Sequence, residues 1–211
     1  MTSEPAENKG TLDSETRLLA AIAYGEASTA DVFEEMAALA SIVLRQSKAR
    51  GYSSLASFTG NEKSFSFVVS DGNKRYKRLM GATAAQLEKS AAMTDAIKAA
   101  RNAFSGGTDY SNGAYFWDGA DIKTKYETHF KVRHGIRFTN PSHYIYSIRE
   151  STKLIIKKKT TKAKVDGKIV TNTKELYRYD HIYESTAALG GTIFWKQSDD
   201  YMKFTGAKAY R

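Results

Sequence analysis

The sequence predicts an α+β fold with a helical N-terminal part, a small antiparallel β part and a basic β-hairpin insertion. Three observations predict it. Apolar residues recur at three- and four-residue intervals in the first half of the chain. Beyond residue 112 the pattern changes to short aromatic and β-branched runs. The pair Asp166-Gly167 lies between two such runs and is typical of a two-residue hairpin turn.

The chain has the size of one domain with a real core. It contains 211 residues, of which 41% are hydrophobic, and only two prolines. Residues 1–12 are polar and lack periodicity, so we expect a disordered tail there. We therefore expect a single domain over residues 13–211, with the basic hairpin at about 151–180.

Three helices are predicted in the N-terminal half. The first is capped by Asp13 or Ser14 and runs towards Gly25, and the second begins at Thr29 or Asp31. Residues 50–82 read as loop, with Ser64 to Val69 extended. The third helix spans about 83–104 and ends at Gly106-Gly107. Five strands are predicted after it, at Ala114 to Trp117, His143 to Ile148, Leu154 to Ile156, Lys168 to Val170 and Thr192 to Trp195.

The net charge of +9 is unevenly distributed. Residues 1–39 carry eight acids and two bases, whereas Arg149 to Arg178 carry ten bases and three acids. Nucleic acid, anionic lipid and anionic cell wall would each complement such a segment, and solubility alone would also account for it. Lys162-Ala163-Lys164-Val165 alternates so as to place ammonium groups on one face of the hairpin. That face would hold anionic cell wall or simply protect a strand edge from aggregation.

The sequence argues against several classes of protein. Without cysteine, disulfides, thiol nucleophiles and Cys-ligated metals are excluded. The four histidines form no HExxH or i, i+4 pair, so we expect no metal and no cofactor. The apolar stretch Leu18 to Tyr24 is too short to cross a bilayer, so no membrane insertion is expected. Met1 to Gly10 lacks the features of a secretory signal.

Glu26 is the first candidate for catalysis. It follows an apolar helix, where burial would raise the pKa of its carboxyl group. A carboxyl group that keeps its proton near neutral pH is what glycosidic cleavage requires, because the leaving sugar oxygen must be protonated. A capping or surface role is the alternative for a glutamate at the end of a helix.

Four segments resemble, in the same order, motifs of the spore-cortex-lytic (SleB-type) cell-wall hydrolases. They are Gly25-Glu26-Ala27 with the helix that ends in Ile42-Val43-Leu44-Arg45, then Ser64-Phe65-Ser66, then Gly113-Ala114-Tyr115-Phe116-Trp117, then His143-Tyr144-Ile145-Tyr146. The resemblance covers residues 15–148. Arg45-Gln46 replaces the family's Asn-Arg, Pro141-Ser142 replaces a glycine before the late histidine, and the basic segment after residue 150 has no counterpart.

The resemblance implies a lysozyme-like fold with Glu26 as the catalytic acid and peptidoglycan as the substrate. It places Tyr24, Ser64 and Phe65 on the cleft wall. Similar domains occur in toxins that bacteria inject into rivals. The resemblance thus implies action in the periplasm or cell wall and a possible immunity protein as partner. Without a secretory signal at Met1 to Gly10, the protein is expected either to stay in the cytosol or to be delivered by a specialised secretion system or within a larger protein.

Other site residues are expected around Glu26. A hydrolase needs a second carboxylate, for which Glu35 and Glu34 are the nearest candidates and Asp109 and Asp118 weaker ones, whereas a lytic transglycosylase uses one glutamate and a hydroxyl of the substrate. The same acids would also serve a helix dipole or a turn. The expected substrate-binding residues, each with core packing as its alternative, are Tyr115, Trp117, His143 and Tyr146.

Two rival functions remain open. A basic, aromatic-rich chain is typical of nucleic-acid-binding modules, although no helix-turn-helix, zinc-finger or RNA-recognition signature is present, so nucleic acid is an unlikely partner. The other rival keeps the fold and makes the chain a noncatalytic cell-wall binder.

Overall fold

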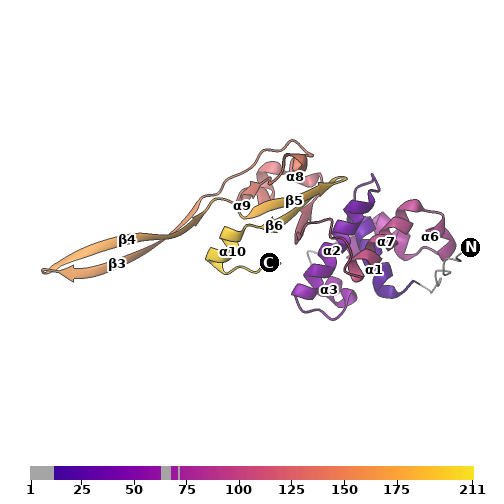
Figure 1. The fold of residues 1–211 in the computed structure, drawn as a ribbon, viewed down its shortest axis with the longest axis horizontal. Helices are drawn as coiled ribbons and strands as arrows, with labels where there is room; N and C mark the ends of the chain where they lie inside the picture. The colour runs from indigo at the N-terminus through magenta and orange to yellow at the C-terminus, as the bar shows by residue number, and fades with distance from the viewer. Residues whose placement is uncertain (1–11, 63–67, 71) are drawn as a thin grey trace, which may run out of the picture.

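The computed structural model describes residues 12–62, 68–70 and 72–211. It shows an α+β protein in which a helical body is followed by a β region and a long projecting hairpin (Figure 1). Residues 1–11 of the expected tail, together with Ser64 and Phe65, lie outside the described residues.

In the part of the helical body that the structure describes, three helices form the centre and shorter ones lie around them. Their bounds are α1 Ser14–Glu26, α2 Phe33–Ala49, α3 Leu55–Asn61, α5 Lys74–Met80, α6 Ala84–Glu88 and α7 Ala91–Phe104. Helices α1, α2 and α7 pack against one another, and alanines fill their shared core. Small side chains let helix backbones approach closely, which is why this alanine-rich region forms the main core.

Helix boundaries differ from the predicted ones in three places. The second helix begins at Phe33, because Asp31 has a φ of 56°, outside the helical region. The segment 50–82 is not loop: it contains α3 and α5, and Val68 to Ser70 are helical rather than extended. The predicted helix 83–104 is two helices, because the Ser90 side chain accepts a hydrogen bond from the Met93 amide and starts α7 anew.

A four-stranded sheet follows the helical body. Its strands are β1 Phe116–Asp118, β2 Ile136–Arg137, β5 Tyr183–Leu189 and β6 Thr192–Gln197, in the order β1-β6-β5-β2. The β1–β6 and β5–β6 pairs are antiparallel, but β2 pairs with β5 in parallel, so the sheet is mixed rather than antiparallel as expected.

Strand β6 lies between the two hydrophobic cores of the molecule. Phe194 packs into the helical core, whereas Ile193 and Trp195 face a second core. The second core is covered by short helices, α8 Asp121–Thr124, η1 Tyr126–Thr128 and α9 Phe130–His134. Side chains on both faces of β6 are therefore buried.

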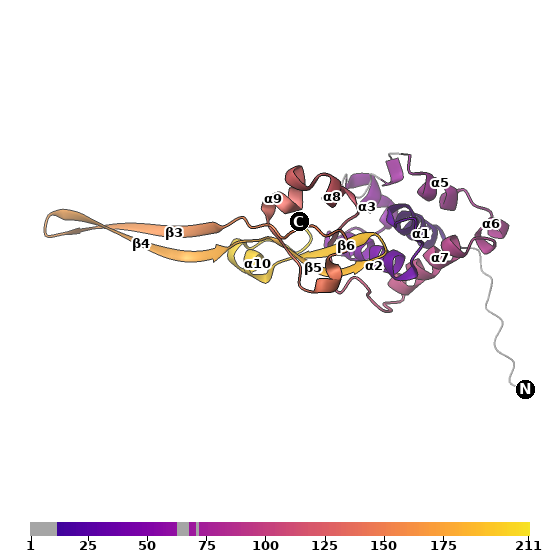
Figure 2. The same cartoon turned by 90° about the horizontal axis from the view of Figure 1, so that it is seen from above.

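The basic hairpin consists of β3 Ile155–Val165 and β4 Lys168–Tyr179. Asp166 and Gly167 both have positive φ, 50° and 82°, as a type I′ turn requires. The hairpin extends well beyond the rest of the molecule in two perpendicular views (Figures 1 and 2). At its base lies the last helix, α10 Asp199–Thr205.

The predicted strand at His143 to Ile148 is wrong. Pro141 to His143 form a 3-10 turn, η2, with Pro141 at its start and the Asn140 side chain accepting a hydrogen bond from the Ser142 amide. Ser147 has a φ of 52°, which no regular strand adopts. In the part of the chain that the structure describes, no helix combines the length and apolarity needed to span a membrane.

Candidate active site

Glu26 is the last residue of α1, and its side chain is half-buried. The indole Nε1 of Trp117 donates a hydrogen bond to Glu26 Oε2 over 3.2 Å. The two residues are 91 positions apart in the chain, and they belong to two different motifs of the resemblance. The fold thus brings the predicted acid and the predicted aromatic strand into direct contact.

Gly25 allows a close approach of the chain beside this acid. A Cβ at this position would lie 2.7 Å from Val68 Cγ2 and 3.2 Å from Asn73 Oδ1. The Asn73 amide also donates to the Gly25 carbonyl over 2.9 Å. Since any larger residue would displace these neighbours, the glycine before Glu26 has a steric explanation.

Tyr24 is buried, with 4% of its surface exposed. The guanidinium of Arg75 lies 3.9 Å from the centre of its ring, and Arg75 Nε donates to the Tyr24 carbonyl over 2.7 Å. Arg75 also forms an ion pair of 2.7 Å with Asp31. The Tyr24 ring therefore lies among core residues, and Arg75 fixes the end of α1.

Glu35 is fully buried, and its carboxylate accepts four hydrogen bonds. Ser28 donates from its amide (3.1 Å) and hydroxyl (2.7 Å), the Gly191 amide donates over 3.1 Å and the Thr192 hydroxyl over 2.7 Å. This carboxylate connects the loop between α1 and α2 to the turn between β5 and β6. Its neighbour Glu34 is exposed in the first turn of α2.

Tyr146 lies beside the same turn. Its hydroxyl donates to the Gly191 carbonyl. Burial and the nearby Glu35 and Asp121 carboxylates raise the pKa of Tyr146 above its ordinary value, so the hydroxyl remains a donor. Tyr146 thus belongs to the structure that holds the β5–β6 turn against Glu35.

Tyr115 is held by its backbone. Its amide donates to the Trp195 carbonyl over 2.9 Å, and its carbonyl accepts from Gln46 Nε2 over 2.7 Å. The neighbouring Arg45 contacts the Ala114 carbonyl and lies 5.6 Å from the Tyr115 ring centre. The Arg45-Gln46 pair, where the sequence departs from the family motif, therefore positions the strand that carries Trp117.

Asp109 completes this arrangement. It forms an ion pair with Arg45 and accepts hydrogen bonds from the Ser111 hydroxyl (2.6 Å) and the Gly113 amide (2.9 Å). Burial opposes ionisation, but the Ser111 hydrogen bonds and the Arg45 charge outweigh it and hold the pKa of Asp109 below its ordinary value. Asp109 is an ionised carboxylate that fixes the approach to β1.

His143 is buried in contact with β5. Its Nδ1 lies 2.7 Å from the Ser185 hydroxyl oxygen, and burial lowers the pKa of the imidazole. We therefore assign it a neutral imidazole at pH 7. The structure joins His143 to Ser185 rather than to Glu26.

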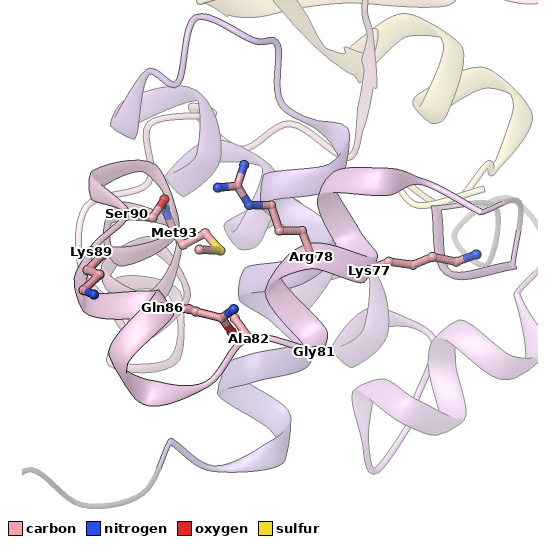
Figure 3. A pocket seen from close by; sticks show the side chains of 8 residues that line it. All are labelled: Lys77, Arg78, Gly81, Ala82, Gln86, Lys89, Ser90 and Met93. Atoms are coloured by element: carbon pink, nitrogen blue, oxygen red, sulfur yellow. The ribbon is translucent and has the colours of Figure 1, made fainter.

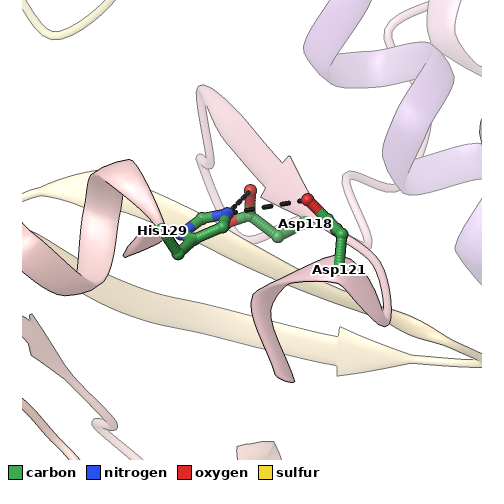
Figure 4. A group of neighbouring side chains, drawn as sticks. All are labelled: Asp118, Asp121 and His129. Atoms are coloured by element: carbon green, nitrogen blue, oxygen red, sulfur yellow. Dashed lines mark ion pairs between the residues drawn. The ribbon is translucent and has the colours of Figure 1, made fainter. Parts of the chain in front are cut away.

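Asp118 lies on the opposite face of β1 from Trp117, within a charged cluster (Figure 4). His129 Nε2 is 3.3 Å from Asp118 Oδ1 and 3.7 Å from Asp121 Oδ2, which makes these three residues a candidate metal-binding group. However, Lys131 Nζ lies 2.8 Å from the same Asp118 oxygen and already supplies a positive charge. We therefore read the cluster as an ion-pair network that holds β1.

Two cavities lie away from Glu26. One, of about 390 Å³, is bordered by α5, α6 and α7, with Arg78, Gln86 and Met93 among its lining residues and the Lys77 side chain extending away from it (Figure 3). The other, of about 520 Å³, is lined by residues of α2 and the chain after α7, including Arg45, Asp109 and Tyr115. Glu26 lines neither cavity.

Sequence reasoning missed several residues that support Glu26. Arg75 and Asn73 bind the carbonyls of Tyr24 and Gly25, and Ser28 anchors Glu35. The segment containing Arg75 and Asn73 was read as loop, and hydrogen bonds to a carbonyl about 50 residues away leave no local pattern. The contact between Ser28 and Glu35 is the one with a local signal, because the two residues lie seven positions apart on either side of the start of α2.

No family model, curated protein or solved structure matches this chain.

Proposed function

We propose that this protein cleaves the glycan strands of peptidoglycan, with Glu26 as the general acid of a lysozyme-like domain. The contact between Glu26 and Trp117 carries the proposal. Two segments that separately resemble motifs of the cell-wall hydrolases meet where the Trp117 indole donates a hydrogen bond to the Glu26 carboxylate. A half-buried carboxyl group whose orientation is fixed by a neighbour is what a general acid requires.

The chemistry proposed for Glu26 is protonation of the glycosidic oxygen as its bond to the anomeric carbon breaks. The positive charge that develops on the sugar ring must then be removed by water or by a hydroxyl of the substrate. The Trp117 indole holds the carboxyl group in one orientation, and Gly25 lets α1 end close to its neighbours.

We further propose that cleavage proceeds without a second catalytic carboxylate. The acids singled out by the sequence are otherwise engaged: Glu35 accepts four hydrogen bonds, Asp109 pairs with Arg45 and Asp118 pairs with Lys131. Glu34 is exposed on the first turn of α2. This favours attack by a hydroxyl of the substrate itself, as in a lytic transglycosylase, with the hydroxyl proton passing to the Glu26 carboxylate that has just protonated the leaving oxygen, and an anhydro sugar as the product.

The test is mass spectrometry of the fragments that the protein releases from purified peptidoglycan. We expect the wild type to release disaccharide-peptides that are lighter by one water than hydrolysis products. Glu26→Gln is expected to reduce release by at least about 100-fold, since general acid catalysis contributes that much or more. Glu34→Gln removes the same charge at an exposed site and is expected to retain release.

Two outcomes would contradict the proposal. Absence of released sugar from wild-type reactions would leave a noncatalytic basic module that binds cell wall or nucleic acid, which the lysine-rich hairpin favours. Equal release by Glu26→Gln would remove Glu26 from the mechanism. Fragments that carry a full water would instead show hydrolysis and require a second group that activates water.

The proposed site of action is the periplasm or cell wall, in a rival bacterium if the chain is a delivered toxin. Expression directed to the periplasm is then expected to be toxic, and expression in the cytosol harmless. Toxicity in the cytosol would contradict a wall target. A cognate immunity protein would be expected to bind near Glu26 and to suppress the periplasmic toxicity.

A further inference from the structure

The two faces of the β3–β4 hairpin carry different charge arrangements. Cross-strand partners share a face, and alternate residues along a strand lie on opposite faces. The register pairs Lys159 with Lys174 and Lys158 with Glu175. We call the face of Lys159 the lysine face; its basic residues are Lys157, Lys159, Lys168 and Lys174. We call the other the paired face; its charged residues are Lys158, Lys162, Lys164, Glu175 and Arg178.

The predicted row of ammonium groups on one face is therefore only part of the pattern. Lys162 and Lys164 do share a face, but four further lysines lie on the opposite one.

Contacts within the hairpin partly satisfy the paired face. Lys158 lies opposite Glu175, and the Thr160 and Thr173 hydroxyl oxygens are 3.2 Å apart. Arg178 forms hydrogen bonds of 2.7 and 2.8 Å with Glu175, and these lower the pKa of that carboxyl group. This face thus neutralises some of its own charge.

The lysine face has no acid along its strands. Lys159 of β3 and Lys174 of β4 lie directly opposite each other, and Lys157 lies two residues before Lys159 in β3. Like charges in a direct cross-strand pair destabilise a sheet. A two-stranded ribbon that is solvated on both faces is already marginally stable. An anion bound between these ammonium groups would remove the repulsion.

Aromatic contacts hold the base of the hairpin. The Tyr177 ring, on the lysine face opposite Lys157, stacks on Phe204 of α10 with centroids 5.0 Å apart and planes 4° apart. Tyr179 contacts Tyr201 edge-on at 5.4 Å. The Lys157, Lys159 and Lys174 cluster is therefore carried on a ribbon that is fixed at one end and reaches away from the body (Figure 1).

We propose that the lysine face binds the phosphate-bearing polymers of the cell envelope and so holds the protein on the wall that Glu26 cleaves. This proposal rests on the proposed function. The Cβ atoms that carry these side chains are spaced by about 5 Å across the ribbon and about 7 Å along it, and the long lysine side chains can therefore contact successive phosphates of a phosphodiester chain.

The hairpin is less suited to nucleic acid. Between Lys157 and Leu176 there is no aromatic side chain and no arginine. Single strands are bound by stacking on aromatic rings, and base edges are read mainly by arginine and amide groups.

The test compares two triple variants that each remove three positive charges. Lys157→Gln/Lys159→Gln/Lys174→Gln alters the lysine face, and Lys158→Gln/Lys162→Gln/Lys164→Gln alters the paired face. Binding is measured in a Glu26→Gln background by co-sedimentation with Gram-positive sacculi, before and after acid removal of their phosphate polymers. Soluble poly(glycerol phosphate) and duplex DNA serve as competitors at equal phosphate concentration.

We expect the lysine-face triple to weaken sedimentation by at least about tenfold, the paired-face triple by less than about threefold, and removal of the polymers to abolish the difference. Poly(glycerol phosphate) should compete better than DNA. Equal losses in the two triples, or better competition by DNA, would overturn the proposal.

Lys159→Glu provides an independent check on folding. It replaces a like-charged pair by an opposite-charged one, so it should stabilise the hairpin and still lose polymer binding. Retained binding would contradict the proposal. Sugar release by wild-type and triple-variant enzymes from polymer-free peptidoglycan is scored separately. A failure of the hairpin proposal leaves that release in place, and a failure of the catalytic proposal leaves sedimentation in place.

Discussion

At the scale of single residues, Gly25 shows how a sequence motif follows from packing. The glycine precedes the proposed acid because α1 ends against Val68 and Asn73, with no room for a Cβ. Alanine normally stabilises a helix relative to glycine. At this position we expect the steric contacts of the added Cβ to outweigh that gain in helix propensity.

Gly25→Ala is therefore expected to destabilise the protein by about 1–3 kcal/mol, as overpacking does, and to lower sugar release. Gly60 in α3 is the control, because a Cβ there meets nothing within 4 Å. Gly60→Ala should leave the protein as stable or stabilise it by about 0.5 kcal/mol. Urea unfolding of both variants checks the pair, and equal effects would show that propensity dominates.

Glu35 was a candidate catalyst on sequence grounds, but its contacts describe a residue that joins two parts of the fold. Glu35→Gln would place an amide NH2 among four donors, and we expect it to cost about 2–4 kcal/mol. Glu34→Gln, on the exposed side of the same helix turn, should change the free energy of unfolding by less than about 0.5 kcal/mol. A catalytic Glu35 would instead show lost activity at unchanged stability.

Tyr183 is expected to make the stability of the protein fall at alkaline pH. Burial, followed by the neighbouring Tyr201 and Asp118, raises the pKa of its hydroxyl to about 12. The folded state therefore favours the neutral phenol. Its contribution is fully present below the unfolded pKa of about 10 and is lost as the pH rises towards 12.

The expected loss of stability between pH 10 and 12 is about 2–3 kcal/mol from this residue. Denaturant unfolding across that range measures it, and Tyr183→Phe should reduce the slope by this residue's share, while buried tyrosines such as Tyr146, whose pKa is also raised, keep the rest. An unchanged slope in Tyr183→Phe would assign the whole effect to other groups.

The residues of the candidate site were predictable to different degrees. Glu26 and Trp117 lie in motifs that are visible locally, so both could be singled out as candidates from the sequence, although their contact could not. The hydrogen bonds that hold Glu35 could not be predicted, because two of its partners, Gly191 and Thr192, lie more than 150 positions away. Short motifs single out candidate residues, whereas hydrogen-bond donors that are distant in the sequence determine the environment of each side chain.

At the scale of elements, the hairpin depends on α10 for its attachment. Both strands are exposed over most of their length, so the aromatic contacts at the base, Tyr177 with Phe204 and Tyr179 with Tyr201, hold the hairpin. Tyr177→Ala is expected to speed amide exchange throughout β3 and β4 and to leave β5 and β6 unchanged. Hydrogen exchange with mass spectrometry measures this, and Tyr52→Ala, at a distant aromatic contact in the helical body, is the control.

Local signals explain which elements were predicted. Asp166-Gly167 predicts the hairpin because a type I′ turn depends on two adjacent residues. The break at Ser90 was missed because the apolar period continues through it, and only a capping hydrogen bond marks the new helix. Strand β2 is two residues long and pairs in parallel with β5. A strand this short has no detectable periodicity, so neither the strand nor its partner could be predicted from the sequence.

At the scale of the whole molecule, two cores share one strand. The helical core and the core beneath α8 and α9 meet at β6, and the Glu35 carboxylate joins the α1–α2 loop to the turn that begins this strand. The α+β class was predictable from the change of periodicity near residue 112. The division into two cores was not, because it depends on which face of β6 each side chain occupies.

The chain contains two tryptophans, and the fold gives each core one of them: Trp117 packs against the helical core and Trp195 lies within the other. Ultraviolet emission can therefore follow the two cores separately. Trp117 is also bonded to Glu26, and a protonated carboxyl group quenches an indole more than a carboxylate does. The difference in fluorescence emission between the wild type and Trp117→Phe, measured as a function of pH, would thus report the protonation state of Glu26, the proposed acid.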